Sequence, residues 1–210
     1  MADLVLYIGD KNLSSWSLRP WFLMKHAGIE FRERLIRLDR PQTKSELADV
    51  SPSLRVPCLL DDGLTVWDSL SICEYLAELF PDRKLWPDDR AARATARSVA
   101  AEMHSGFSSL RTLWPMHFVR EGLRHTTHGI ADDIARIAEI WESCRRDHGK
   151  GGDFLFGRFS IADAMFAPVV SRFVTYGPVD LPARAARWRD MMWALPAMKE
   201  WGEGARAETR

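Results

Sequence analysis

Short apolar runs and one amphipathic stretch alternate along the first part of the chain. Residues 4–8 (Leu-Val-Leu-Tyr-Ile) are apolar and predict a β-strand. After a polar loop at 12–15, apolar positions recur at helical spacing up to Gly28, a residue typical of helix ends. We place Pro20 in the first turn of this helix, where a proline is tolerated. Residues 31–38 predict a second strand, with arginines on its exposed side.

Two further apolar runs, 58–60 and 64–67, flank the turn sequence Asp-Asp-Gly at 61–63, which is typical of a hairpin. Residues 68–80 repeat apolar side chains on one helical face and predict a helix. The charged segment 39–50 between them predicts a loop or a short helix. A right-handed crossover makes the first two strands parallel neighbours, and the hairpin adds two antiparallel strands. The pattern therefore predicts a four-stranded mixed sheet with flanking helices.

From residue 91 the composition changes to helix formers with almost no strand signal. This change predicts an α/β unit over 1–82, a linker at 83–90 and an all-α unit over 91–210. Within the second unit, Ser-Ile-Ala-Asp at 160–163 has the form of a capping box. The helices expected there lie at about 89–120, 129–148, 160–175, 183–194 and 196–203.

The Val56-Pro57 step is the first candidate for function. Proline cannot donate to a sheet ladder, so its place just before an apolar run is unusual. We predict a cis bond that leaves the Val56 N–H and C=O free to pair with an extended peptide. Asp68-Ser69 opens the next helix, where a hydroxyl and free N–H groups suit a carboxylate. Together they predict a pocket for a small zwitterionic peptide; an edge-strand proline and an ordinary N-cap pair are the alternatives.

Composition narrows the range of functions. Lys plus Arg equal Asp plus Glu at 29 each, so no nucleic acid or other polyanionic partner is indicated. Cys58, Cys73 and Cys144 are widely spaced, and His104 and His117 lack a partnered cluster, so we expect inert thiols and no metal. The chain opens without a signal-peptide pattern and has no charge-free stretch long enough to span a membrane. We therefore expect a cytoplasmic protein without membrane contact.

Three motifs resemble the cytosolic glutathione S-transferases, and the resemblance covers nearly the whole chain. Residues 14–19 (Ser-Ser-Trp-Ser-Leu-Arg) are similar to the Ser-Ser-Cys-Ser-x-Arg loop of the zeta class, the maleylacetoacetate isomerases. Residues 67–76 are similar to the family's Glu/Asp-Ser-x-Ala-Ile-x-x-Tyr-Leu pattern, and 160–163 to its helix-capping signature. The resemblance implies a thioredoxin-like N-terminal domain, an all-helical C-terminal domain, glutathione as co-substrate without a metal, and a homodimer. We also expect a dimer because the helical half carries many aromatic side chains.

The resemblance also implies a serine-type enzyme, with Ser14 as hydrogen-bond donor to the glutathione thiolate and Ser15 as the alternative. A free thiol has a pKa of about 8.5, so lowering it by two units takes roughly 2.7 kcal/mol of preferential thiolate stabilisation. A hydroxyl at a helix N-terminus supplies interactions of this kind. Either serine could simply cap the helix, and capping uses the same geometry.

The other implied contacts involve the two ends of the tripeptide. Val56 pairs with the cysteinyl unit, Ser69 holds the γ-glutamyl carboxylate, and Asp68 suits the ammonium group. Arg19, Arg40 and Gln42 are candidates for the second carboxylate, although each is more typical of a solvated surface. The residues expected to bind substrate are Trp16, Gln42, Arg55, Val56, Pro57, Asp68 and Ser69.

Two departures from the family pattern affect the function. Leu54-Arg55 replaces the usual Gly-Lys or Gly-Gln pair, and Trp16 replaces the zeta-class cysteine, which reshapes the electrophile pocket. The leading function is glutathione addition to, or glutathione-assisted isomerisation of, a small electrophile, a chemistry used in detoxification. The alternative is a non-catalytic glutathione-transferase-like binding or assembly module. A thiol–disulfide oxidoreductase is disfavoured because the active loop has no cysteine. The sequence does not identify the electrophile.

Overall fold

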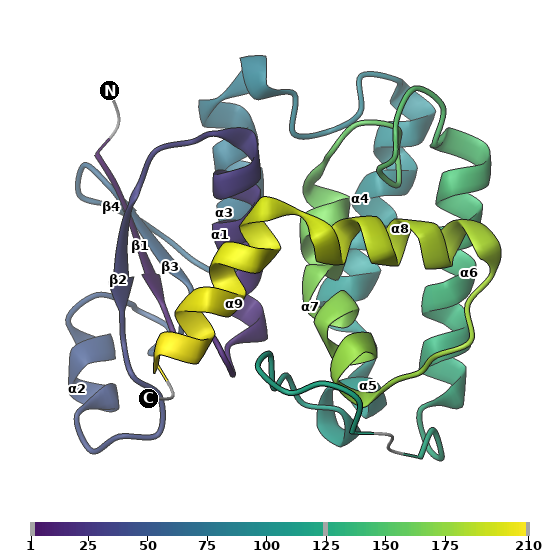
Figure 1. Ribbon diagram of the computed structural model, residues 1–210. Helices are drawn as coiled ribbons and strands as arrows, with labels where there is room; N and C mark the ends of the chain where they lie inside the picture. The colour runs from purple at the N-terminus through teal and green to yellow at the C-terminus, as the bar shows by residue number, and fades with distance from the viewer. Residues whose placement is uncertain (1–2, 124–125, 209–210) are drawn as a thin grey trace.

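A four-stranded mixed sheet forms one end of the molecule in the computed structural model, which describes residues 3–123 and 126–208 (Figure 1). The strands are β1 (Leu4–Ile8), β2 (Arg32–Leu35), β3 (Cys58–Asp61) and β4 (Leu64–Val66), in the order β2-β1-β3-β4. β1 and β2 are parallel, and the other two pairs are antiparallel. The predicted fold class and sheet are therefore confirmed.

Strand β2 is shorter than the predicted 31–38. It pairs with β1 only from Val5↔Arg32 to Ile8↔Leu35, so the short central strand limits its length. The hairpin between β3 and β4 turns through Asp62 and Gly63, which both have positive φ, as a two-residue turn of this kind requires.

Helices α1 (Ser15–Ala27) and α3 (Ser69–Leu79) pack against each other beside the sheet, and the short α2 (Thr43–Ala48) lies in the connection between β2 and β3. The predicted end of α1 is confirmed, because Gly28 has a left-handed backbone and donates to the last carbonyls. The placement of Pro20 in the first turn is wrong. The helix begins at Ser15, so Pro20 lies in the second turn and removes one backbone donor there.

The rest of the described chain is helical. Its elements are a 3₁₀ turn (Pro81–Arg83), α4 (Arg90–Ser105), α5 (Ser108–Leu113), α6 (Ala131–His148), α7 (Ile161–Tyr176), α8 (Ala183–Ala194) and α9 (Pro196–Glu208). The predicted capping box forms, since the Asp163 carboxylate accepts from the Ser160 N–H at 2.9 Å.

Two predicted helices differ from those observed. The single helix expected at 89–120 is broken at Gly106 and Phe107, where Phe107 has a φ of 60°. The Arg111 guanidinium donates to backbone carbonyls of Met103 and Gly106, which stabilises the break. The last helix continues to Glu208, past its predicted end at 203.

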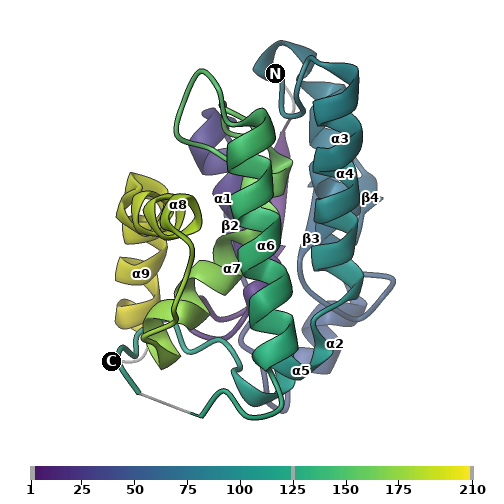
Figure 2. The ribbon, with the colours of Figure 1, turned by 90° about the vertical axis from the view of Figure 1, so that its right-hand side faces the viewer.

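A single core joins the sheet end to the helices. Helix α7 packs against both α1 and α4, and α9 lies against α1 (Figures 1 and 2). Trp21 of α1 and Trp201 of α9 meet with ring centres 5.0 Å apart. Trp21, Trp114, Trp141, Trp188 and Trp201 are at most 1% exposed within one chain. The large aromatic content is thus accommodated without a partner, which removes our sequence argument for a dimer.

Candidate functional site

A pocket of about 420 Å³ lies where α1, the loop before β3, the start of α3 and helix α4 meet. We call it the Val56 pocket. Six of the nine predicted site residues line the Val56 pocket. The lining consists of Trp16, Ser53, Arg55, Val56, Pro57, Trp67, Asp68, Ser69 and His104.

The Val56-Pro57 bond is cis, as predicted. Among the described residues, no hydrogen bond is found to the Val56 backbone, so its N–H and C=O are available to a ligand. Gly9, which follows β1, lets the side chains of Val56 and Leu38 approach the backbone closely. A Cβ there would lie 3.0 Å from Val56 Cγ2 and 2.8 Å from Leu38 Cδ1. The sheet end therefore presents an unpaired peptide unit to the pocket.

The start of α3 carries the second predicted anchor. Asp68 is the N-cap, and its Oδ1 accepts from the N–H groups of Leu70 and Ser71 at 3.1 and 3.4 Å. Ser69 is completely buried, and its Oγ has no hydrogen-bond partner among the described residues. An unpaired buried hydroxyl is costly unless a ligand completes it. This atom fits the predicted role of Ser69 in holding a carboxylate.

His104 of α4 is a pocket residue that our sequence reasoning did not single out. Its Nε2 lies 3.0 Å from Asp68 Oδ2, which joins the helical half to the start of α3. Its Nδ1 is buried and has no partner in the described part of the chain. Its helical spacing put it in a stripe of residues that could line the electrophile pocket, and such a stripe is more often core. The contact with Asp68 could not be predicted, because it depends on the packing of two distant helices.

Ser14 and Ser15 lie at the start of α1 but outside the lining of the Val56 pocket. The Ser14 hydroxyl caps the helix: it accepts from the Ser17 N–H at 3.3 Å and donates to Ser17 Oγ at 2.8 Å. Ser17 Oγ also accepts from the Gly9 N–H at 3.0 Å. The Ser15 hydroxyl makes no hydrogen bond with another described residue. Ser14 thus has the capping role, while the Ser15 hydroxyl is unengaged.

The three candidates for a second carboxylate contact are placed differently. Gln42 and Arg40 are exposed, and Gln42 precedes α2 without lining the pocket. The view of Arg19 as a solvated group is wrong, because its side chain is completely buried on the inner face of α1. Arg55, which replaces a residue of the usual family pattern, is exposed and lines the pocket.

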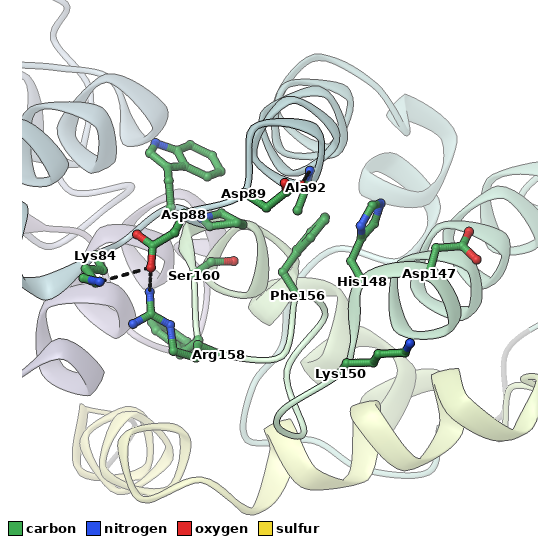
Figure 3. A pocket seen from close by; sticks show the side chains of 13 residues that line it. Lys84, Asp88, Asp89, Ala92, Asp147, His148, Lys150, Phe156, Arg158 and Ser160 are labelled. Atoms are coloured by element: carbon green, nitrogen blue, oxygen red, sulfur yellow. Dashed lines mark hydrogen bonds and ion pairs between the residues drawn. The ribbon is translucent and has the colours of Figure 1, made fainter.

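A second cavity, which we call the Asp88 pocket, lies at the start of α4 and the end of α6 (Figure 3). Its lining contains none of the predicted site residues. The Asp88 carboxylate lies 3.1 Å from Lys84 Nζ and 3.7 Å from an Arg158 nitrogen, so all three charged groups have a partner within the protein. This pairing distinguishes the Asp88 pocket from the Val56 pocket, where buried polar atoms lack partners among the described residues.

The three cysteines are buried and unpaired. Burial raises the pKa of Cys58, Cys73 and Cys144, so their thiols are unreactive. Within the described residues, no group of three His, Cys, Asp or Glu side chains is arranged to hold a metal ion. Across the same residues, the helices are too short or too polar to cross a membrane.

Family models match both halves of the chain. The model of the glutathione S-transferase N-terminal domain matches residues 13–79, and that of the C-terminal domain matches 92–201. Maleylacetoacetate isomerase of Rattus norvegicus is 34% identical over 172 residues, which cover 80% of this chain and 76% of that protein. Probable maleylacetoacetate isomerase of Caenorhabditis elegans is 34% identical over 109 residues, so the match spans only half (50%) of that relative's length and 52% of this chain.

Solved structures extend the match to nearly the full chain. A glutathione transferase homolog from Burkholderia with bound glutathione has a TM-score of 0.72 and 26% identity, covering 98% of this chain and 99% of that one. An epsilon-class glutathione S-transferase from the housefly Musca domestica has a TM-score of 0.74 and 25% identity, with 98% and 94% covered. Since the C-terminal family model alone matches more than half of the sequence, the chain belongs to the glutathione S-transferase family.

Proposed function

We propose that this protein is an enzyme that binds glutathione in the Val56 pocket and activates its thiol toward a small electrophile. The observation that carries the proposal is the convergence of unpaired polar groups on one pocket. The Val56 peptide unit and the Ser69 hydroxyl both lack partners among the described residues. In this assignment Val56 pairs with the cysteinyl backbone, Ser69 binds the γ-glutamyl carboxylate, and Asp68 faces the ammonium group.

The thiol is activated at the start of α1. A hydroxyl of Ser14 or Ser15 donates to the thiolate, and the positive end of the helix adds to its stabilisation. Ser15 is available without breaking an existing bond, whereas Ser14 would exchange its bond to Ser17 Oγ for one to sulfur. Trp16, Arg55 and Pro57 complete the substrate surface, while Gln42 is not among the residues that line the pocket. The thiolate then attacks the electrophile and forms a carbon–sulfur bond, while a leaving group departs with its electron pair or, in an addition, the double bond opens and takes up a proton.

Isomerisation is the second candidate reaction, and the names of the two curated relatives favour it. In that reaction the thiolate adds to a double bond, the carbon skeleton rotates, and the thiolate leaves again, so glutathione is not consumed. The replacement of the zeta-class cysteine by Trp16 favours transfer over isomerisation. The alternative of a non-catalytic module predicts binding without turnover.

We further propose that residues 1–82 and 91–210 act as two units joined at 83–90, and that the protein is a cytoplasmic homodimer. The family relationship supports both proposals. Sedimentation at micromolar concentration tests the dimer, and a monomer there would contradict it.

Replacing each serine by alanine tests the catalytic proposal. Loss of one charge-assisted hydrogen bond costs about 1.5–3 kcal/mol, so the donor's removal should lower turnover of a generic aryl halide by about 10- to 100-fold at neutral pH. Affinity for glutathione, measured by calorimetry, should change little. The deficit should shrink as the pH rises through the pKa of the free thiol, because the thiolate then forms unaided.

Ser14→Thr is the matched control, because it retains both the hydroxyl and the cap. A loss caused only by the missing cap would lower stability by about 1 kcal/mol and would not be repaired at high pH. If neither alanine variant matters at any pH, the serine mechanism is wrong. If the wild-type protein binds glutathione without turnover, the binding-module alternative is correct.

A further inference from the structure

A cluster of three arginines lies inside the helical packing beside the Val56 pocket. Arg19 on α1 is completely buried, Arg172 on α7 is 3% exposed, and Arg111 on α5 is half-buried. The hydrogen bonds found for the three side chains among the described residues all run to backbone carbonyl oxygens, not to carboxylates. Among the described residues, the cluster therefore has no counter-ion in direct contact, although Asp133 and Asp68 favour the charged forms of Arg111 and Arg19 from a greater distance.

Several N–H groups of this cluster also lack partners. Both Nη atoms of Arg19 and the Nη1 atom of Arg111 are buried and unpaired within the described residues. Burial lowers the pKa of Arg19, and the neighbouring charges of Arg111 and Arg172 act in the same direction. A buried charge without a partner is costly, so another group must compensate for it.

Trp16 lies against two of these arginines and contributes to this compensation. The guanidinium carbon of Arg19 lies 4.3 Å from the centre of the Trp16 ring, and that of Arg111 lies 4.6 Å from it. The face of an indole carries partial negative charge and attracts cations strongly where water is excluded. Trp16 also lines the Val56 pocket, whereas Arg19 and Arg111 do not. The indole thus lies between the ligand space and the guanidiniums.

We propose that Trp16 determines the charge of the electrophile that the enzyme accepts. Its indole occupies the place of a counter-ion beside Arg19 and Arg111, and it thereby closes an anion-binding site to the substrate. A carboxylate on an electrophile that lies against Trp16 finds no N–H of Arg19 or Arg111. Arg55, the arginine of the pocket lining, directly precedes Val56, the residue assigned to glutathione, while the surfaces of Trp16, Trp67 and Pro57 suit a flat uncharged ring. The substrate class is therefore uncharged, planar electrophiles. This inference rests on the proposed glutathione transfer.

A matched pair of substrates tests it. In 2-chloro-1,3-dinitrobenzene and 4-chloro-3,5-dinitrobenzoate, the glutathione sulfur forms a bond to the ring carbon and chloride leaves, and the two substrates differ only in the carboxylate of the second. The wild-type enzyme should have the higher kcat/KM for the uncharged substrate. In Trp16→Ala, the ratio of carboxylated to uncharged kcat/KM should rise by about 10-fold or more, since one charge-assisted hydrogen bond becomes available. Using a ratio cancels a general loss of activity.

The double variant Trp16→Ala/Arg111→Met is the control. It should lower the ratio part of the way toward the wild-type value, because one of the two guanidiniums beside Trp16 is removed and that of Arg19 remains. A ratio that stays unchanged in Trp16→Ala would overturn the proposal, and so would a wild-type enzyme that uses the carboxylated substrate at least as efficiently as the uncharged one. The second outcome needs no variant, so the test survives if Trp16→Ala does not fold.

Sulfate binding provides a readout that does not depend on turnover. Sulfate should raise the thermal midpoint of Trp16→Ala above its value in sodium chloride at equal ionic strength, and by more than it raises those of the wild-type protein and the double variant. An equal rise in all three would mean that no anion site is uncovered, and would overturn the proposal. If the wild-type protein neither binds glutathione nor turns over the uncharged substrate, the proposed function fails, and the sulfate comparison still decides whether Trp16 closes an anion site.

Discussion

Two groups of buried polar atoms in this molecule can be compared directly. The first group lies at the start of α7, and we call it the Asp163 cluster. There the Asp163 carboxylate accepts from the N–H of Leu155, the N–H of Ser160 and the indole N–H of Trp188, each at 2.9 Å. In the Val56 pocket, Ser69 Oγ and His104 Nδ1 are equally buried but have no partner among the described residues.

This difference separates structure from function. A buried polar group that the protein itself satisfies fixes the local fold, and its loss leaves several donors unpaired. A buried polar group that the protein leaves unpaired is costly until something binds to it. The Asp163 cluster is therefore expected to determine stability, whereas the unpaired atoms of the Val56 pocket are expected to determine ligand binding.

The largest effect is expected for Asp163→Ala. Removing the carboxylate leaves its buried donors without an acceptor, so the free energy of unfolding should fall by about 3–5 kcal/mol. Urea denaturation measures this loss. The control is Asp153→Ala, which changes an exposed aspartate in the same connection. A loss of stability below about 1 kcal/mol, the level typical of a surface substitution, would show that the Asp163 cluster does not determine stability.

The pH dependence of stability sharpens the same comparison. Burial raises the pKa of Asp163 from its ordinary value of 3.8 to about 6, although its hydrogen bonds act in the opposite direction. The folded protein then binds more protons than the unfolded chain between these pH values. Asp163 therefore adds roughly 3 kcal/mol to the free energy of unfolding at low pH. This contribution is fully present below pH 3.8 and is lost as the pH rises through 6.

Chemical denaturation of the wild-type protein and Asp163→Asn from pH 4 to 7 measures this effect, because asparagine does not titrate. The stability of the wild-type protein relative to the variant should decrease as the pH rises. A relative stability that increases with pH would show that the hydrogen bonds outweigh burial.

Ser69→Ala should affect glutathione binding more than stability, the opposite of what we expect for Asp163→Ala. The hydroxyl has no protein partner to lose, so stability should change by less than about 1 kcal/mol. The KM for glutathione should rise by about 10-fold, since one hydrogen bond to a carboxylate is lost, while kcat changes less. Ser71→Ala, which alters an exposed serine on the same helix, is the matched control and should leave KM unchanged. A drop in kcat with an unchanged KM would place Ser69 near the reacting sulfur instead.

The smallest effect is expected at His104. Its contact with Asp68 holds a carboxylate that is exposed to solvent, and such pairs contribute at most about 1 kcal/mol. His104→Ala should therefore raise the KM for glutathione by about 2- to 5-fold. His104→Gln retains a side-chain donor and should restore most of the affinity. Equal losses in both variants would indicate that the imidazole ring itself touches the ligand.

The sequence predicted the features that depend on neighbouring residues. The four strands, the hairpin at Asp62-Gly63, the end of α1 at Gly28 and the cis bond at Val56-Pro57 follow from turn residues, caps and short apolar runs, which act locally. The pairing of β3 with β1 was not predicted. The break between α4 and α5 was missed. It depends on the Arg111 side chain, which folds back onto carbonyls at the end of α4.

Local sequence was enough to predict the two-motif pocket, since Val56-Pro57 and Asp68-Ser69 each present backbone or hydroxyl groups in a way fixed by local geometry. The tertiary structure decided which charges surround it. Arg19 had the pattern of a surface residue, and only the packing of α1 against α7 buries it and brings it under the Trp16 ring. His104 likewise reaches Asp68 only because α4 packs against α3. Burial and pairing of charge depend on the approach of segments far apart in the chain, and spacing along a sequence does not encode that approach.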